Sequence, residues 1–120
     1  QIKELDKVLQ DDLILDIGPK TIDKIKDIIE LSETILWNGP AGYFENLSFA
    51  NGSYEIAKKI NEKNKNNLIY SIAGGGDTIA VLNQVNAFKN FNFVSTAGGA
   101  FLEYLEGKEL PGIKALNQYV

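Results

Sequence analysis

A run of three glycines followed by an aspartate and a threonine has the residue types needed to bind a phosphate. Gly74, Gly75 and Gly76 follow an apolar segment, and Asp77 and Thr78 open the next amphipathic stretch. Glycine lets the backbone approach a ligand closely, and a helix that begins there directs free N–H groups at an anion. The Asp77 carboxylate suits a Mg²⁺ ion that accompanies a phosphate, and Thr78 offers a hydroxyl. The alternative is a tight turn in which Asp77 only caps the helix.

The two commonest phosphate fingerprints do not match this segment. A P-loop requires Lys and then Ser or Thr after its last glycine, but Asp77 occupies that place. The dinucleotide-binding pattern requires glycine where Ile79 stands. The segment therefore has the physical features of a phosphate cradle without following either template.

Two further segments combine glycines with groups that could contact a ligand. Residues 37–45 (WNGPAGYFE) contain two glycines, a proline and Glu45, whose carboxylate could accept hydrogen bonds from ribose hydroxyls. Residues 95–100 (STAGGA) place two glycines before another amphipathic stretch. The alternatives are a surface carboxylate at Glu45 and a plain strand-to-helix turn at 95–100.

Each glycine segment follows a short apolar run that predicts a buried strand. Strands are expected at residues 13–16, 34–37, 68–72 and 93–95. Helices are expected at about 21–31, with Thr21 as its cap, and at 53–63, 78–84 and 99–106, the last stopped by Gly107. This alternation predicts an α/β protein with three layers, in which a mostly parallel, Rossmann-like sheet has helices on both faces. The glycine turns should then lie at the carboxyl edge of the sheet, where ligands bind in such folds.

Composition excludes several classes of function. The chain has 120 residues, enough for one domain at most, and a formal net charge of −4. Cysteine, histidine and arginine are all absent, which excludes thiolate nucleophiles, Ser-His triads and histidine metal ligands. No basic stripe suggests a nucleic-acid partner, and the apolar runs are too short to span a membrane. These features agree with a cytoplasmic protein.

Five segments together resemble the phosphoglycerate kinase family in order and spacing. The resemblance covers nearly the whole chain. The matching segments are residues 16–20 (DIGPK), 37–45 (WNGPAGYFE), 71–78 (SIAGGGDT), 94–100 (VSTAGGA) and 105–112 (LEGKELPG).

The resemblance implies a two-domain, cytoplasmic glycolytic kinase. Such an enzyme transfers a phosphoryl group between 1,3-bisphosphoglycerate and Mg-ADP to give 3-phosphoglycerate and Mg-ATP. Residues 1–120 would be the C-terminal portion of its nucleotide-binding domain. The N-terminal domain, which holds 3-phosphoglycerate or 1,3-bisphosphoglycerate, would be missing. The full-length enzyme is expected to be a monomer, and the isolated segment is expected to be inactive.

The resemblance also implies roles for individual residues. Asn38 and Pro40 would line the nucleotide pocket, and Glu45 would bind the ribose hydroxyls. The nucleotide phosphates would be held by Gly74, Gly75, Gly76, Asp77 and Thr78, with Asp77 helping to place Mg²⁺. Backbone amides would act on the transferring phosphoryl group at Gly75, Gly98 and Gly99.

Two departures from the family pattern affect the third glycine turn. Ala97 stands where the family usually has glycine, and Phe101 where it usually has a small polar residue. Two other readings of the chain remain open at this point. One is a stand-alone nucleotide-binding module without catalysis, and the other is an interaction domain whose glycines are structural.

Overall fold

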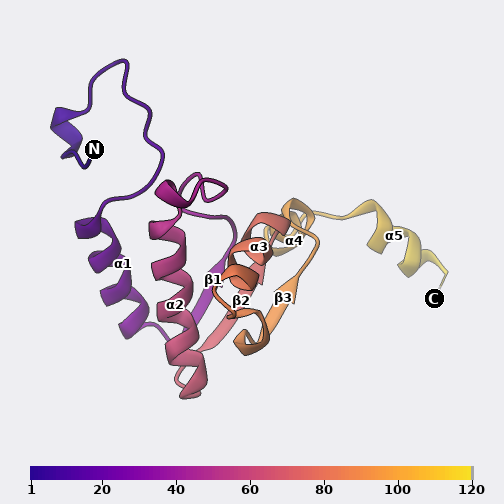
Figure 1. Ribbon diagram of the computed structural model, residues 1–120. Coiled ribbons are helices and arrows are strands. Elements are labelled where there is room, and N and C mark those ends of the chain that lie inside the picture. Colours follow the sequence, from indigo (N-terminus) through magenta and orange to yellow (C-terminus); the bar gives the residue numbers. More distant parts are fainter. Residues whose placement is uncertain (120) are drawn as a thin grey trace.

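The computed structural model describes residues 1–119, which form an α/β arrangement with helices packed mainly on one face of a small sheet (Figure 1). The strands are β1 (Thr34–Trp37), β2 (Tyr70–Gly74) and β3 (Phe93–Ser95). The α-helices are α1 (Pro19–Leu31), α2 (Asn51–Lys65), α3 (Gly76–Gln84), α4 (Gly99–Leu105) and α5 (Pro111–Gln118). Three short 3₁₀ helices are η1 (Leu5–Lys7), η2 (Leu47–Phe49) and η3 (Phe88–Asn90).

The three strands form a parallel sheet in the order β1-β2-β3. Thr34 to Trp37 pair with Tyr70 to Ala73, and Ile72 to Gly74 pair with Phe93 to Ser95. The parallel α/β architecture predicted from the sequence is therefore confirmed. Two strands have the predicted bounds, and the middle strand begins two residues later than expected.

The predicted strand at residues 13–16 was wrong. These residues are irregular, and the side chains of Leu13 and Ile14 are 81% and 72% exposed. An apolar run becomes a strand only where a neighbouring strand completes its hydrogen-bond ladder. Here the carbonyl of Leu15 instead accepts a hydrogen bond from the N–H of Tyr43, at 2.7 Å, in the loop after β1.

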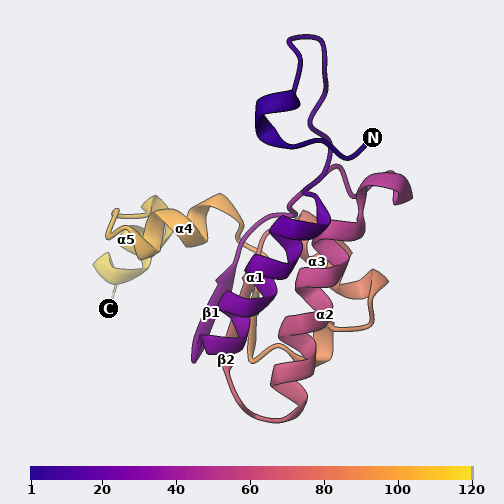
Figure 2. The ribbon, with the colours of Figure 1, turned by 90° about the vertical axis from the view of Figure 1, so that its left-hand side faces the viewer.

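The main core lies between one face of the sheet and helices α1, α2 and α3 (Figure 2). It includes Trp37 and Ala73 from the strands and Ile60 and Leu82 from the helices. The opposite face is much less covered within residues 1–119, because Leu36, Tyr70 and Phe93 remain 42%, 51% and 50% exposed. On that face α4 contributes Phe101, whose ring lies 6.4 Å from that of Phe93. Phe101 therefore serves in packing.

Helix α1 begins earlier than predicted. Its N-cap is Gly18 and its first residue is Pro19, so Thr21 lies inside the helix and does not cap it. Proline suits the first helical position, since its fixed φ matches the helix and its missing N–H is not needed there. Ile22 and Ile29 are buried, whereas Ile28 is exposed.

A buried lysine joins α1 to α2. Lys63 is only 6% exposed, and its Nζ donates hydrogen bonds to the carbonyl oxygens of Ile29 at 3.1 Å, Ser32 at 3.4 Å and Glu30. These carbonyls belong to the C-terminal end of α1, where the helix leaves acceptors unpaired and its dipole favours a cation. Lys63, on α2, thus provides hydrogen bonds to the carbonyl oxygens at the C-terminal end of α1.

The two ends of the described chain project from the sheet and its helices (Figures 1 and 2). The Cα radius of gyration is 16.7 Å, compared with about 14 Å for a compact domain of this length. At the C-terminal side, α4 ends at Leu105 and Gly107 follows with φ of +83°, as the predicted glycine stop requires. No helix within residues 1–119 has the length and apolarity needed to cross a membrane.

Candidate phosphate-binding site

The strongest candidate from the sequence lies where β2 passes into α3. Gly75 has a φ of +94°, which an L side chain rarely adopts, and Gly76 begins the helix. The free N–H groups of the first turn of α3 therefore lie directly after β2, at the carboxyl edge of the sheet. This geometry provides amides and a positive dipole end for an anion.

Asp77 is exposed in the first turn of α3. The N-cap is Gly75, and no side chain makes a capping hydrogen bond, so the alternative in which Asp77 caps the helix was wrong. Within residues 1–119, Asp77 forms none of the hydrogen bonds or ion pairs found for the other side chains. Its carboxylate is therefore available to a ligand that approaches the end of the helix.

Three glycine turns converge at this edge. The N–H of Gly39, after β1, donates a 2.7 Å hydrogen bond to Oγ1 of Thr78 in α3. The N–H of Gly75 donates to the carbonyl of Ser95 at the end of β3, at 3.2 Å. A Cβ atom on Gly98 would lie 3.8 Å from the Cα of Gly75. The structure thus brings together turns that are far apart in the sequence, as the parallel sheet predicts.

Asn38 lies at the centre of this convergence. Its Oδ1 is buried and has no hydrogen-bond partner within residues 1–119. A Cβ on Gly74 would lie 2.6 Å from this oxygen and 3.0 Å from Cδ1 of Phe101, so only glycine fits between them. Buried polar atoms are nearly always paired, and an unpaired one beside a helix N-terminus therefore marks a candidate ligand-contacting group.

Thr78 occupies a different position from the one its predicted role suggests. Its side chain is fully buried, and its hydroxyl oxygen already accepts the hydrogen bond from Gly39. The hydroxyl can still donate one hydrogen bond, because a threonine oxygen is both donor and acceptor. The observed contact makes Thr78 a link between the turn after β1 and the start of α3.

The third turn accommodates its departure from the family pattern. Ala97 has an ordinary negative φ, and its N–H donates to Oγ of Ser95 at 3.2 Å. The left-handed conformation is adopted one residue later, by Gly98 with φ of +54°, and Gly99 begins α4. Alanine at position 97 therefore does not strain this turn.

Two predicted nucleotide contacts lie on the loop that follows β1. Pro40 is partly exposed, and Glu45 is exposed in the turn before η2. In residues 1–119, no hydrogen bond joins the Glu45 side chain to the three glycine turns. The structure therefore places Glu45 on the same loop as Asn38 but not in direct contact with the other predicted residues.

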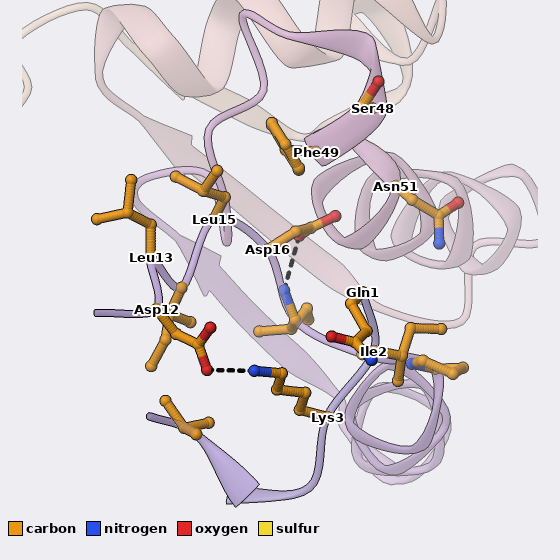
Figure 3. A pocket seen from close by; sticks show the side chains of 15 residues that line it. Gln1, Ile2, Lys3, Asp12, Leu13, Leu15, Asp16, Ser48, Phe49 and Asn51 are labelled. Carbon is orange, nitrogen blue, oxygen red and sulfur yellow. Dashed lines mark hydrogen bonds and ion pairs between the residues drawn. The ribbon is translucent and has the colours of Figure 1, made fainter. Parts of the chain in front are cut away.

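One cavity lies apart from the glycine turns. It has a volume of about 500 Å³ and is lined by residues between positions 1 and 19, by Ser48 and Phe49 of η2 and by Asn51 at the start of α2 (Figure 3). Its two carboxylates are already used: Asp12 pairs with Lys3 at 2.5 Å, and Asp16 accepts the N–H groups of Ile17 and Gly52. Ligand sites combine apolar walls with convergent free polar groups, and this cavity offers none among its lining carboxylates. We therefore place the candidate site at the glycine turns.

Two residues near the site were not identified from the sequence. Oγ of Ser53, in the first turn of α2, accepts the N–H of Ala41 at 2.9 Å. Asp16 accepts the N–H of Gly52 at 3.0 Å. The sequence shows Ser53 only as the expected start of a helix and Asp16 as the end of an apolar run. Neither position has a signal that reveals its partner.

The residues present fit a magnesium ion that travels with a nucleotide. Magnesium is held by one or two carboxylates together with substrate phosphates and retained water, and Asp77 is a free carboxylate beside the α3 amides. No cluster of three or more acidic, histidine or cysteine residues occurs in the described part of the chain. Asp77 would therefore share the ion with the phosphates.

The fold and the three converging turns place the chain among parallel α/β proteins with glycine-rich turns at the carboxyl edge of the sheet. The family model described as phosphoglycerate kinase matches residues 1–108. The chain belongs to the phosphoglycerate kinase family.

Relatives and solved structures agree with this membership. A phosphoglycerate kinase of Chelativorans sp. (strain BNC1) is 47% identical over 115 residues, which are 96% of this chain and 29% of the relative. One from Orientia tsutsugamushi (strain Ikeda) is 52% identical over 105 residues, covering 88% of this chain and 26% of the relative. The structure of phosphoglycerate kinase from Coxiella burnetii matches with a TM-score of 0.85 and 43% identity, over 99% of this chain and 30% of that one. The chain thus spans less than a third of the proteins it resembles.

Proposed function

We propose that this chain supplies the phosphate- and ribose-binding part of the Mg-nucleotide site of a phosphoglycerate kinase. The single observation that carries the proposal is the exposed start of α3, where Gly75 turns with positive φ and Asp77 has a free carboxylate. The unpaired oxygen of Asn38 beside the same turn supports it. We propose the reaction from the membership of the chain in the phosphoglycerate kinase family.

In the proposed reaction, a carboxylate oxygen of 3-phosphoglycerate attacks the γ-phosphorus of ATP. A new oxygen–phosphorus bond forms, the bond to the β–γ bridging oxygen breaks, and ADP leaves. The reverse direction returns the phosphoryl group from 1,3-bisphosphoglycerate to ADP. Catalysis of such a transfer consists mainly of positioning and electrostatic stabilisation.

The residues of this chain bind and orient the nucleotide in that scheme. The free amides at the start of α3, at Gly76 and Asp77, hold phosphate oxygens, and Asn38 and Pro40 line the pocket beside them. The N–H of Gly75 is engaged by the carbonyl of Ser95, so Gly75 contributes the turn and not a phosphate contact. Asp77 helps to hold the magnesium ion, which neutralises charge on the phosphate oxygens. The amides at Gly98 and Gly99 face the transferring phosphoryl group, and Glu45 accepts hydrogen bonds from the ribose.

The rest of the active site lies, on this proposal, in polypeptide outside residues 1–120. The cationic group that stabilises the equatorial oxygens of the phosphoryl group would come from that polypeptide, since the chain contains no arginine to supply a guanidinium. The second substrate would also be held there, so residues 1–120 alone should not catalyse the transfer. We propose that the longer enzyme acts in the cytoplasm as a monomer.

Replacing Asp77 with alanine in the full-length protein tests this proposal. Asp77→Ala removes the carboxylate but leaves the glycine turn, and kcat should fall roughly 10²-fold or more, as is typical when a positioned electrostatic group is lost. The measurement is a coupled assay with Mg-ATP and 3-phosphoglycerate over a range of Mg²⁺ concentrations. Glu33→Ala is the matched control, because Glu33 is an exposed carboxylate immediately before β1, at the opposite end of the sheet. Equal kinetics in the two variants would overturn the role of Asp77.

A further inference from the structure

The loop of residues 39–43 is held by alternate backbone amides, each bonded to a different part of the molecule. The N–H of Gly39 donates to Oγ1 of Thr78 in α3 at 2.7 Å. The N–H of Ala41 donates to Oγ of Ser53 in α2 at 2.9 Å, and that of Tyr43 donates to the carbonyl of Leu15 at 2.7 Å. Asn38 immediately precedes this loop, Pro40 lies within it, and Glu45 follows two residues after its end.

Ser53 makes the central contact of the three. Its side chain is fully buried, and its position is fixed because it belongs to the first turn of α2. A hydroxyl held rigidly in a helix gives the loop a defined anchor, whereas a solvated amide would leave it free to move. The contact lies at the middle of the loop, so its loss would affect both ends.

Asp16 in turn fixes the start of α2. Its Oδ2 accepts the N–H of Gly52, the residue before Ser53. Its Oδ1 accepts the N–H of Ile17, a bond drawn in Figure 3. A carboxylate at a helix N-terminus is favoured by the dipole and satisfies a free amide. The loop also passes Asp16 closely, since a Cβ on Gly42 would lie 2.6 Å from its Oδ1 and 2.7 Å from the carbonyl oxygen of Leu15.

We infer that Ser53, supported by Asp16, is a positioning residue that holds the nucleotide-contacting loop in place. This inference rests on the proposed function, because the loop matters only if Asn38 and Glu45 contact nucleotide. Ser53 itself is buried beneath the loop and acts through the Ala41 amide. The role differs from general stabilisation, since it is specific to one loop and therefore to one substrate.

The test uses Ser53→Ala in the full-length protein with two measurements. Amide hydrogen exchange in the nucleotide-free protein should become faster across residues 39–43. The KM for Mg-ATP should rise roughly three- to tenfold, as the loss of one hydrogen bond implies, while the KM for 3-phosphoglycerate stays unchanged. Asp16→Asn, which replaces one of two acceptor oxygens with a donor, should act in the same direction and serves if Ser53→Ala does not fold.

Ser71→Ala is the matched control. Ser71 is also fully buried, and its hydroxyl bonds Asn64 at 2.6 Å and Asn92 at 3.2 Å near the amino end of β2. This variant should lower thermal stability to a similar degree without changing loop exchange or nucleotide KM.

Three outcomes for Ser53→Ala would overturn the inference: unchanged loop exchange, faster exchange with an unchanged nucleotide KM, or equal rises in KM for both substrates. A wild-type protein that does not use Mg-ATP would instead refute the proposed function. The exchange experiment would still show whether Ser53 holds the loop in that case, so the two failures are distinguishable.

Discussion

At the scale of single residues, the candidate site depends on side-chain oxygens that have no hydrogen-bond partner in the described chain and are therefore available to a ligand. Asp77 has an exposed carboxylate without a partner in the described chain, and Asn38 has a buried oxygen without one. Thr78 shows the contrasting case, because its hydroxyl oxygen is already engaged by Gly39. The sequence suggested a magnesium contact for Asp77 and a phosphate contact for Thr78, and the structure shows that the hydroxyl oxygen of Thr78 is engaged within the protein.

Glu45 gives the sharpest prediction at this scale, since its proposed partner is a defined part of the nucleotide. In the full-length enzyme, Glu45→Ala should raise the KM for Mg-ATP and leave the KM for 3-phosphoglycerate nearly unchanged. A hydrogen bond to a charged acceptor is worth about 1.5–3 kcal/mol. The measurement compares Mg-ATP with its 2′,3′-dideoxy analogue, which lacks the ribose hydroxyls.

The wild type should prefer ATP to the analogue, and Glu45→Ala should lose that preference. Glu103→Ala serves as a control, because Glu103 is an exposed carboxylate on α4, away from the loop that carries Glu45. An undiminished preference in Glu45→Ala would refute the ribose contact. Equal losses for both substrates would indicate a role in folding.

At the scale of elements, the sequence identified strands and glycine turns well where local chemistry decides the structure. Residues 34–37 and 93–95 form strands as predicted, and the Gly107 stop follows α4. The two strands contain β-branched and aromatic residues, which favour strands, and the Gly107 stop has the positive φ that favours glycine. The parallel order then followed from the helices between the strands.

The failures at this scale have physical causes. Residues 13–16 have the composition of a buried strand, but an apolar composition does not supply the neighbouring strand that a hydrogen-bond ladder requires. Thr21 has a good capping side chain, yet Pro19 two residues earlier already sets the start of α1. The contacts of Ser53 and Asp16 join residues 12 and 36 positions apart, so no local pattern could reveal them.

Lys63 provides a prediction about how α1 and α2 are held together. Lys63→Met keeps much of the apolar stem but removes the donor to three carbonyls at the end of α1. The free energy of unfolding should fall by about 1–3 kcal/mol, the cost of leaving buried acceptors unpaired. Urea unfolding of the full-length protein measures this change.

Lys65→Met is the control for that experiment, because Lys65 lies on the same helix and is exposed. It should change stability by less than about 0.5 kcal/mol, as is usual for surface substitutions. Equal destabilisation by both variants would show that the carbonyl contacts of Lys63 contribute nothing of their own.

At the scale of the whole molecule, the described chain is a partial α/β layer structure. One sheet face is covered by α1, α2 and α3, whereas Leu36, Tyr70 and Phe93 on the other face are about half exposed. Strands β1 and β3 each have a free edge in the three-stranded sheet. The chain spans 29% of its Chelativorans relative, and we expect the remaining polypeptide to pack against these surfaces.

The chain spans only part of its relatives, which explains why the family could be assigned from the sequence although the complete active site could not. The glycine turns are local and lie within residues 1–120, so their order and spacing are visible in the chain. The groups that hold the second substrate and stabilise the phosphoryl group are expected elsewhere. On the proposed function, this site is the nucleotide half of an active site, and the other half would come from other polypeptide.

The most direct test of that claim is a crystal structure of the full-length protein with Mg-ADP. The nucleotide phosphates should lie within hydrogen-bond distance of the backbone amides at Gly76 and Asp77, with the Asp77 carboxylate beside the magnesium ion. The ribose hydroxyls should lie at the carboxylate of Glu45. Mg-ADP bound elsewhere, with the start of α3 in contact only with solvent, would contradict the account.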